Sequence, residues 1–368
     1  LVEVYKEQAK VICEAGADLF VVETMMSLQE CRAAVIAIRE VCDLPIMVSL
    51  TYNEDGRTLY GTDPATAVIV LQSLGADAVG LNCSTGPEAM IDPVQQMVEY
   101  ATIPLLAKPN AGMPELCDGV TVYRTTPEEF ASVGAKLVEA GAAIIGGCCG
   151  TTPEHIRLMA ERLKNKPVKE RHIEKKTVVS SYTHTVTFGA RPILIGERIN
   201  PTGKKKLQAA LRTGDLAYIV GQGISQQEQG ADVLDVNVGL PEIDEPAMMV
   251  RACEELQGST LLPLQIDSTS PVAIEAAVRR YPGKPIINSV NGKRESIDAV
   301  LPIAAHYGCD IVALTLDEAG IPASAEARLQ IAERIVKEAA RYGIGRERIL
   351  VDCLVMTAST NQHQVLDI

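Results

Sequence analysis

Three cysteines in the first half of the chain stand where thiol chemistry is possible. Cys83 comes directly after the apolar run that ends at Asn82, and Cys148 and Cys149 follow another apolar run and are flanked by glycines. If both runs are strands of one parallel barrel, their ends lie on the same rim, and the three sulfurs can converge. Three thiolates with an open fourth position are typical of a catalytic zinc site. Buried free thiols and a disulfide between the adjacent pair remain the alternatives.

Carboxylate and amide side chains follow the apolar runs of the second half in the same way. They are Glu197, Asn200, Asp235, Asn237, Asp267, Asn288 and Asp352. A pocket with this lining accepts N–H donors and donates to ring nitrogens and carbonyls, which suits a flat aminopyrimidinone such as a pterin. Helix capping and loop turns are the other common use of Asp and Asn at such positions.

Alternating apolar runs and helix-period stretches must position these residues. In the first half we expect strands at 18–22, 45–50, 76–81, 103–107 and 142–147, with helices at 28–41, 64–74, 87–100 and 127–140. Asp63-Pro64 and Thr126-Pro127 are helix-start signals, and a glycine precedes several strands as a helix stop. Strands that are apolar throughout and alternate with helices indicate a parallel sheet.

The second half repeats this pattern. We expect strands at 192–195, 233–236, 262–266, 285–287, 310–314 and 348–351, and helices at 215–230, 246–256, 271–280, 296–307 and 324–342. The fold class is therefore α/β, with two consecutive (β/α)₈ barrels. The first would lack its N-terminal strands and the second its C-terminal strands, as in a chain cut at both ends. A doubly wound sheet competes, but no Gly-x-Gly-x-x-Gly follows a first strand.

We expect a first barrel over residues 1–163, a linker over 164–190 and a second barrel over 191–368. Residues 177–188, rich in Thr, Val and Tyr, favour a short hairpin or an extended arm ahead of the second barrel.

The composition of the chain argues against several classes of protein. The chain has 34 Lys and Arg against 47 Asp and Glu, a net charge of −13, which argues against nucleic acid or an anionic membrane as a partner. No apolar run approaches the roughly 20 residues of a membrane span, and no signal peptide opens the chain. Ten cysteines in 368 residues are too sparse for a secreted disulfide scaffold, so we expect a cytoplasmic protein.

Specific motifs carry a resemblance to known families. The segments 80–87 (GLNCSTGP), 108–112 (KPNAG) and 146–156 (GGCCGTTPEHI) resemble the homocysteine-binding domain of homocysteine S-methyltransferases. The segments 195–203 (IGERINPTG), 235–239 (DVNVG) and 287–289 (INS) resemble the pterin-binding domain of folate methyltransferases. Their order is similar to that in the N-terminal half of cobalamin-dependent methionine synthases.

The resemblance implies a zinc ion held by Cys83, Cys148 and Cys149, with the homocysteine thiolate at the open position. It implies a possible oxygen ligand from Asn110 and an amino-group contact from Glu23. In the second barrel it implies pterin binding by Asp267, Asn288 and Asp352, with Glu197, Asn200 and Asn237 in the same pocket.

The expected reaction is methyl transfer from 5-methyltetrahydrofolate through cobalamin to homocysteine, which forms methionine and tetrahydrofolate. Cobalamin would come from a module outside this chain, since the sequence holds no Asp-x-His-x-x-Gly motif. The alternatives are a cobalamin-independent homocysteine methyltransferase fused to a folate-binding domain, and a non-catalytic fragment that binds zinc and folate. Dihydropteroate synthase would explain the second barrel only.

Overall fold

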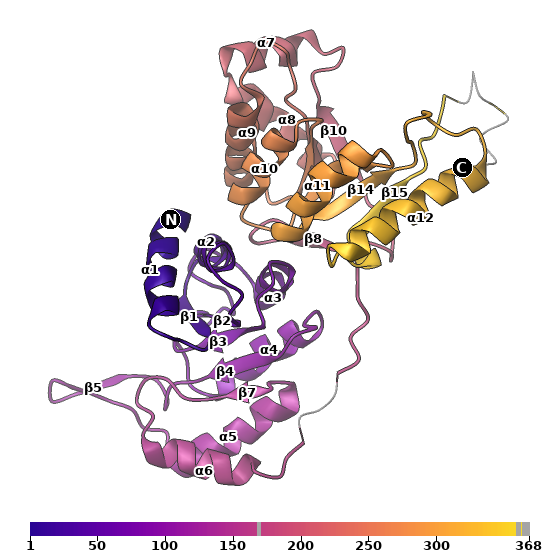
Figure 1. The fold of residues 1–368 in the computed structure, drawn as a ribbon. Coiled ribbons are helices and arrows are strands. Elements are labelled where there is room, and N and C mark those ends of the chain that lie inside the picture. The colour runs from indigo at the N-terminus through magenta and orange to yellow at the C-terminus, as the bar shows by residue number, and fades with distance from the viewer. Residues whose placement is uncertain (168–170, 358–361, 363–368) are drawn as a thin grey trace. The chain divides into compact units, whose positions relative to one another are not determined.

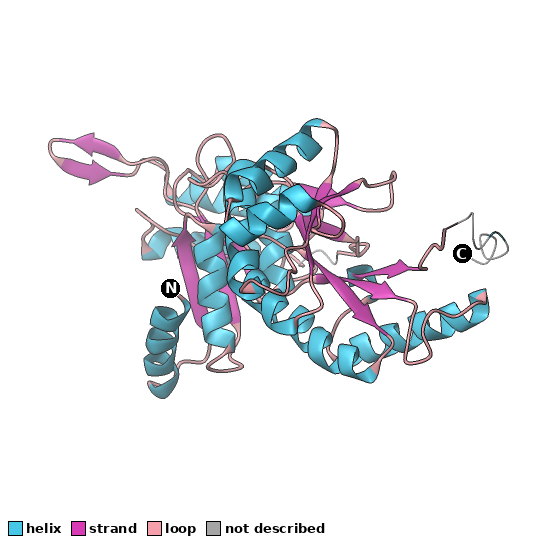
Figure 2. Ribbon diagram, turned by 90° about the horizontal axis from the view of Figure 1, so that it is seen from above, coloured by secondary structure: helices cyan, strands magenta, loops and turns pink. Residues whose placement is uncertain are grey.

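The computed structural model describes residues 1–167, 171–357 and 362, and the chain divides into two compact units, residues 1–175 and 176–368. Each unit contains one parallel sheet with helices packed along it (Figure 1). Figure 2 shows the same alternation of strands and helices from a second direction. The α/β class expected from the sequence is confirmed. The units are described separately below.

The first unit alternates strands and helices almost throughout. Its elements are α1 (Val2–Glu14), β1 (Phe20–Met25), α2 (Leu28–Arg39), β2 (Ile46–Leu50), α3 (Pro64–Ser73), β3 (Ala78–Asn82), η1 (Glu88–Met90), α4 (Ile91–Val98), β4 (Leu105–Lys108), β5 (Glu115–Cys117), β6 (Val120–Val122), α5 (Pro127–Ala140), β7 (Ile144–Ile145) and α6 (Pro153–Leu163).

The expected helix starts form as the sequence signals them. Asp63 accepts a hydrogen bond from the backbone N–H of Thr66, and Thr126 forms a capping box with Glu129. Gly141 ends α5 with a φ of 123°, a value that a side chain would strain. Every residue of β3 is buried, as expected for a parallel strand covered on both faces.

The sheet of the first unit has the order β1-β2-β3-β4-β7, with every neighbouring pair parallel. The hairpin of β5 and β6 was not expected. It projects from the rest of the unit in both Figure 1 and Figure 2. Because β4 leads into this hairpin, the loop after β4 is long and carries Asn110 at its start.

The second unit begins with a hairpin and continues as an alternating α/β chain. Its elements are β8 (Val178–Ser180), β9 (Thr185–Thr187), β10 (Ile195–Ile199), α7 (Lys205–Thr213), α8 (Leu216–Glu228), β11 (Val233–Val236), α9 (Glu245–Ser259), β12 (Leu264–Asp267), α10 (Pro271–Arg280), β13 (Ile286–Asn291), α11 (Arg294–His306), β14 (Asp310–Leu314), α12 (Ala325–Arg341), η2 (Arg346–Arg348) and β15 (Ile349–Asp352).

The hairpin of β8 and β9 is confirmed, but it belongs to the second unit and is not linker. Val179 and Val186 pack with Val233 and Ile286, which lie at the starts of β11 and β13. The backbone of Ser180 also bonds to that of Lys284. The expected linker over 164–190 is corrected accordingly, because its later part fills the core below the sheet. Residues 168–170 of that segment lie outside the described residues.

The order of the strands distinguishes a (β/α)₈ barrel from a doubly wound sheet. The second sheet runs β10-β11-β12-β13-β14-β15, and in both units consecutive helices contact one another. A doubly wound sheet reverses its strand order and divides its helices between two faces, so it is excluded. Among the described strands neither sheet closes, since β1 and β7 pair with one neighbour each, as do β10 and β15.

One strand lies later than expected. β10 covers Ile195–Ile199 instead of 192–195, so Glu197 lies within the strand and does not follow it. Glu197 and Arg198, in the middle of this strand, both face solvent. The strand therefore lacks the continuous apolar run from which strands were predicted.

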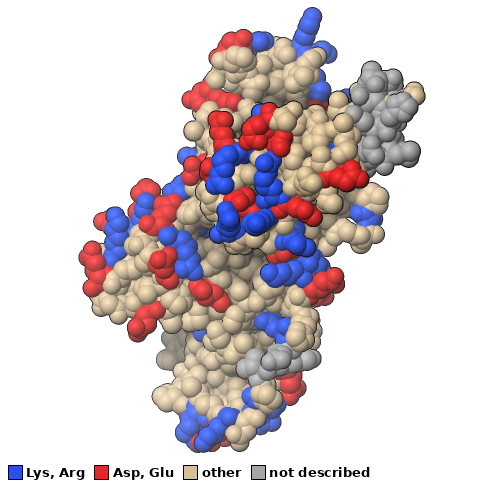
Figure 3. All heavy atoms as spheres, turned by 45° about the vertical axis from the view of Figure 1, so that its right-hand side comes forward, with Lys and Arg blue, Asp and Glu red and all other residues tan. Residues whose placement is uncertain are grey.

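Charged side chains of both signs lie on the surface of the chain (Figure 3). On the face drawn in Figure 3, acidic and basic side chains are interspersed. No helix in the described part of the chain is both long and apolar enough to cross a membrane.

Candidate functional site

The three predicted cysteines of the first unit form one cluster. Cys83 follows β3, and Cys148 and Cys149 follow β7, so the parallel sheet brings both strand ends to one edge. The Sγ atoms of Cys83 and Cys149 are 3.8 Å apart, and those of Cys148 and Cys149 are 4.0 Å apart. All three sulfurs lie within 4.8 Å of one another.

The spacing of the sulfurs fits a zinc ion. Tetrahedral Zn–S bonds of about 2.3 Å place two sulfurs roughly 3.8 Å apart. A disulfide needs an S–S distance of about 2.05 Å, and all ten cysteines are free. The three residues are half-buried or exposed, so buried inert thiols do not describe them either.

The loop that carries Cys83 has an unusual backbone. Cys83 and Ser84 have φ values of 63° and 59°, a left-handed conformation that is uncommon outside glycine. Such conformations cluster at functional sites, where surrounding contacts hold them. Here the Thr51 and Ser84 hydroxyls bond each other, and the Cys83 N–H donates to the Lys108 carbonyl.

The thiols have unequal proton affinities. The pKa of Cys83 lies below its ordinary value. Burial raises this pKa, but the Ser84 backbone N–H and the neighbouring side chains together lower it by more. Burial and the two neighbouring sulfurs raise the pKa of Cys149 to about 11. A metal ion must therefore displace a proton from Cys149 when it binds.

The two other predicted residues of this unit lie beside the cluster or on a neighbouring strand. Asn110 is buried, and its Oδ1 accepts the Cys149 backbone N–H at 3.1 Å. Glu23 lies on β1 and forms an ion pair with Lys108 at the end of β4. Sequence reasoning missed Asn82, whose Oδ1 accepts the backbone N–H of Thr24 at 2.9 Å and whose Nδ2 lies 3.8 Å from Cys148 Sγ.

Five polar side chains of the second unit form two layers at the ends of β11, β12 and β13. In the outer layer Asn237 Nδ2 donates to Asp267 Oδ2 at 2.9 Å. In the inner layer Gln265 Nε2 donates to Asp235. Asn288 is in register with Asp267 of the outer layer, and its Nδ2 donates to the same Asp235 oxygen at 3.2 Å. The layers arise because residues i and i+2 of a strand face the same side.

Burial shifts the acids of this cluster. Burial and the neighbouring Asp267 raise the pKa of Asp235 to about 6, and burial also raises the pKa of Asp267. The negative charge of Glu197 also raises the pKa of both acids, so this charge lies near the cluster. Perturbed carboxyls that share a polar pocket are typical of functional sites.

The remaining predicted pterin residues make local contacts. Asn200 Oδ1 accepts the N–H of Thr202 at 3.0 Å, and Asp352 Oδ1 accepts that of Leu354 at 2.7 Å. Both are turn contacts next to a strand end. The structure thus joins Asn237 to Asp267 and Asn288 to Asp235, all four of which the sequence placed at the strand ends. It adds Gln265, which sequence reasoning missed.

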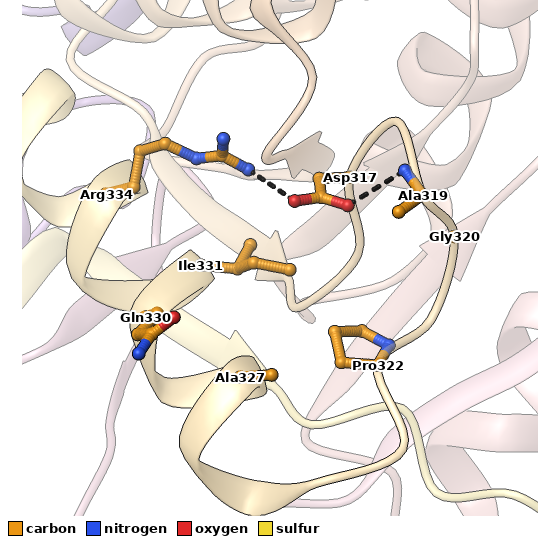
Figure 4. A pocket seen from close by; sticks show the side chains of 8 residues that line it. All are labelled: Asp317, Ala319, Gly320, Pro322, Ala327, Gln330, Ile331 and Arg334. Atoms are coloured by element: carbon orange, nitrogen blue, oxygen red, sulfur yellow. Dashed lines mark hydrogen bonds and ion pairs between the residues drawn. The ribbon is translucent and has the colours of Figure 1, made fainter.

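A separate open pocket of about 440 Å³ lies beside α12 (Figure 4). Its Asp317 accepts hydrogen bonds from Arg334 and from the N–H of Ala319, each at 3.0 Å. None of the predicted pterin residues lines it; the lining residues are Asp317, Ala319, Gly320, Pro322, Ala327, Gln330, Ile331 and Arg334. Because its charged groups already pair with each other, we do not assign it to the pterin.

Comparison with known proteins finds a matching family for a segment of each unit. The homocysteine S-methyltransferase family matches residues 1–163, and the pterin binding enzyme family matches residues 196–368. The methionine synthases of Mycobacterium leprae and Mycobacterium tuberculosis are each 32% identical to the chain, over 381 and 376 residues. Each alignment covers 98% of this chain and 32% of the relative, so the chain spans about a third of their length.

One solved structure is similar to part of the chain. The apo form of the homocysteine methyltransferase MmuM from Escherichia coli is 25% identical, with a TM-score of 0.36, over 44% of this chain and 57% of that one.

Proposed function

The chain is homologous to methionine synthases over about a third of their length, and from this premise we propose that it transfers a methyl group from 5-methyltetrahydrofolate, by way of cobalamin, to homocysteine. The observation that carries the proposal is the convergence of Cys83, Cys148 and Cys149 at distances that suit zinc. The products are methionine and tetrahydrofolate.

The first unit would bind and activate homocysteine. A free thiol is only a few per cent thiolate at neutral pH, so a thiol that accepts a methyl group must be activated. Cys83, Cys148 and Cys149 would hold a zinc ion, whose charge would favour the thiolate form of a coordinated substrate thiol at pH 7. The Glu23 carboxylate would accept a hydrogen bond from the amino group of homocysteine. The same carboxylate forms an ion pair with Lys108. Asn110 would serve as an additional oxygen donor beside Cys149.

The second unit would bind the pterin ring. Asn237 occupies one oxygen of Asp267, which leaves the other to accept a pterin N–H. Asn288 points its amide nitrogen at Asp235 and can present its carbonyl oxygen to the ligand. We include Asn200 and Asp352 in the pocket, since both lie at the carboxyl ends of strands. We include Glu197, in the middle of β10, because its charge adds to burial in raising the pKa of Asp235 and Asp267.

Cobalamin would carry the methyl group between the units. The cysteine cluster is built from the first unit alone and the carboxylate cluster from the second alone. Direct transfer needs the reacting atoms about 3–3.5 Å apart, which two separately built sites do not provide by themselves. We propose that a cobalamin-binding module outside the 368 residues delivers the carrier.

We further propose that each sheet is part of a (β/α)₈ barrel. Sequential strand order and contacts between consecutive helices are what a barrel requires. Ten free cysteines favour a reducing cytoplasm as the location.

Zinc content and homocysteine methylation test the proposal together. The chain should bind about one zinc ion, and with free methylcobalamin and homocysteine it should form methionine. Cys148→Ala should lose both properties, whereas Cys353→Ala, which lies in the other unit, should keep both. Equal zinc content in the two variants by elemental analysis would refute the site.

A further inference from the structure

Hydrogen-bond donors lie beside the sulfurs of the cysteine cluster. Asn82 is 1% exposed, and its Nδ2 lies 3.8 Å from Cys148 Sγ. Its Oδ1 accepts the backbone N–H of Thr24 at 2.9 Å and the Ser49 hydroxyl at 2.7 Å. A backbone N–H can only donate, so this bond fixes the orientation of the amide. The NH₂ group of Asn82 therefore donates to the Thr24 hydroxyl at 2.7 Å and to Cys148 Sγ at 3.8 Å.

The other two sulfurs have donors of their own. Burial and the neighbouring Cys149 raise the pKa of the Tyr123 hydroxyl, and the effect of Cys149 places that hydroxyl beside the Cys149 sulfur. The ring of Tyr123 lies against Gly150, where an added Cβ would come within 2.2 Å of Tyr123 Cγ. Cys83 accepts from the Ser84 backbone N–H and from the side chain of Asn110.

These contacts bear on a problem that any zinc thiolate methyltransferase must solve. Three cysteine thiolates and one substrate thiolate would share a metal ion, and all four sulfurs are nucleophiles. A hydrogen bond to a thiolate stabilises its negative charge and makes its lone pair less available. The Asn82 amide and the Tyr123 hydroxyl lie beside two of the protein's own sulfurs, those of Cys148 and Cys149.

We propose that the donors from Asn82 and Tyr123 direct methylation to homocysteine by protecting Cys148 and Cys149, an inference that rests on the proposed zinc-dependent function. Both are positioning residues, since they act through the cysteines. In the protected reaction the substrate sulfur forms the new S–C bond, the bond from the methyl carbon to its leaving group breaks, and the leaving group takes that electron pair. Methylation of a cysteine by the same route would destroy a metal ligand.

Two nearly isosteric variants remove one donor each. Asn82→Asp keeps an oxygen to accept from the Thr24 backbone N–H and the Ser49 hydroxyl, but it loses the N–H that faces Cys148 and the one that bonds the Thr24 hydroxyl. Tyr123→Phe keeps the ring against Gly150 and loses only the hydroxyl. Tyr342→Phe, in the second unit, is the matched control.

The experiment treats zinc-loaded chain with iodomethane in the presence of homocysteine and locates the methyl groups by peptide mass spectrometry. Sulfur attacks the methyl carbon and iodide leaves with the bonding pair. We expect wild type and Tyr342→Phe to methylate homocysteine ahead of their cysteines. Asn82→Asp should methylate Cys148 about tenfold faster and Tyr123→Phe should do so at Cys149, the scale of one hydrogen bond to a charged group.

The location of the methyl group separates this inference from a structural effect and from the proposed function. Methylation of all three cysteines, with zinc lost, in both variants would mean that Asn82 and Tyr123 merely support the fold, and would overturn the inference. An unchanged pattern with zinc retained would also overturn it. Failure of the wild-type chain to bind zinc would instead refute the proposed function.

Discussion

Asn288 donates its side-chain amide to Asp235 across two neighbouring layers of the second sheet, with 3.2 Å between Nδ2 and Oδ1. Gln265 donates to the same carboxylate oxygen. The buried carboxylate therefore fixes which end of the Asn288 amide faces a ligand. Asp235, in the inner layer, thus orients Asn288, which is a predicted pterin-binding residue.

The first prediction concerns that orientation. Asn288→Asp replaces the N–H that faces Asp235 with an oxygen, so the two acids repel each other and the acceptor offered to the pterin is displaced. Affinity for methyltetrahydrofolate should fall by about 1–3 kcal/mol, the cost of an unpaired buried polar group. Isothermal titration calorimetry measures it, with Asn53→Asp in the first unit as the control. Equal affinity for methyltetrahydrofolate in the two variants would contradict the assignment of Asn288 to the pterin pocket.

The second prediction concerns pH. Burial beside Asp267 raises the pKa of Asp235 to about 6, whereas an Asp in an unfolded chain titrates near 3.9. The folded chain holds this proton more tightly, so its stabilising effect is complete below about pH 4 and is lost as pH rises through about 6. Asp235→Asn should remove that part of the pH dependence, up to about 3 kcal/mol in the free energy of unfolding of the second unit. Urea denaturation followed by hydrogen exchange at pH 4 and pH 7 tests it, and identical pH slopes in variant and wild type would contradict it.

The third prediction concerns the buried ion pair below the second sheet. Lys284 Nζ lies 2.5 Å from Asp310 Oδ1 and donates to the Val178 carbonyl, so it ties the β8–β9 hairpin to the sheet. Lys284→Met leaves Asp310 without its main partner and should cost on the order of 3–5 kcal/mol. Hydrogen exchange should show the loss in the second unit, and Lys293→Met, at an exposed position, should show none. A loss of similar size in both variants would show that the ion pair is not the cause.

The fourth prediction uses two glycines of the first unit. Gly150 and Gly119 both have positive φ, 76° and 80°, so alanine strains both backbones. Only at Gly150 would the new Cβ collide, with the ring of Tyr123 beside Cys149. Gly150→Ala should therefore weaken zinc binding, measured by competition with a chromogenic chelator, and Gly119→Ala should not. Equal affinities would mean that the Tyr123 contact does not shape the site.

Topology explains which parts of the sites could be predicted. Cys83 and Cys148 are far apart in sequence, yet both follow apolar runs of a repeating α/β pattern, and parallel strands bring such ends together. The same rule located Asp267 and Asn288. Asn237 could be assigned with them because it lies two residues after Asp235 and faces the same side.

Other features depended on contacts that the pattern does not encode. Gln265 is one polar residue in an apolar strand, and only its bond to Asp235 shows its part in the cluster. Asn82 preceded Cys83 in the predicted motif, but its hydrogen bond to Thr24 depends on the pairing of distant strands. The β5–β6 hairpin did carry a usable signal, because Asp118-Gly119 is a strong turn dipeptide between short strands.

The central claim is that two separate sites exchange a methyl group through cobalamin, and two single variants test it most directly. Both half-reactions are measured with free cobalamin: demethylation of methyltetrahydrofolate by cobalamin(I), and methionine formation from methylcobalamin and homocysteine. Cys149→Ala should abolish the second and leave the first intact, and Asp267→Ala should do the reverse, while Asp298→Asn, at an exposed position, should leave both unchanged. Methyl transfer from folate to homocysteine without any corrinoid would contradict the account, as would the loss of both half-reactions in either variant that remains folded.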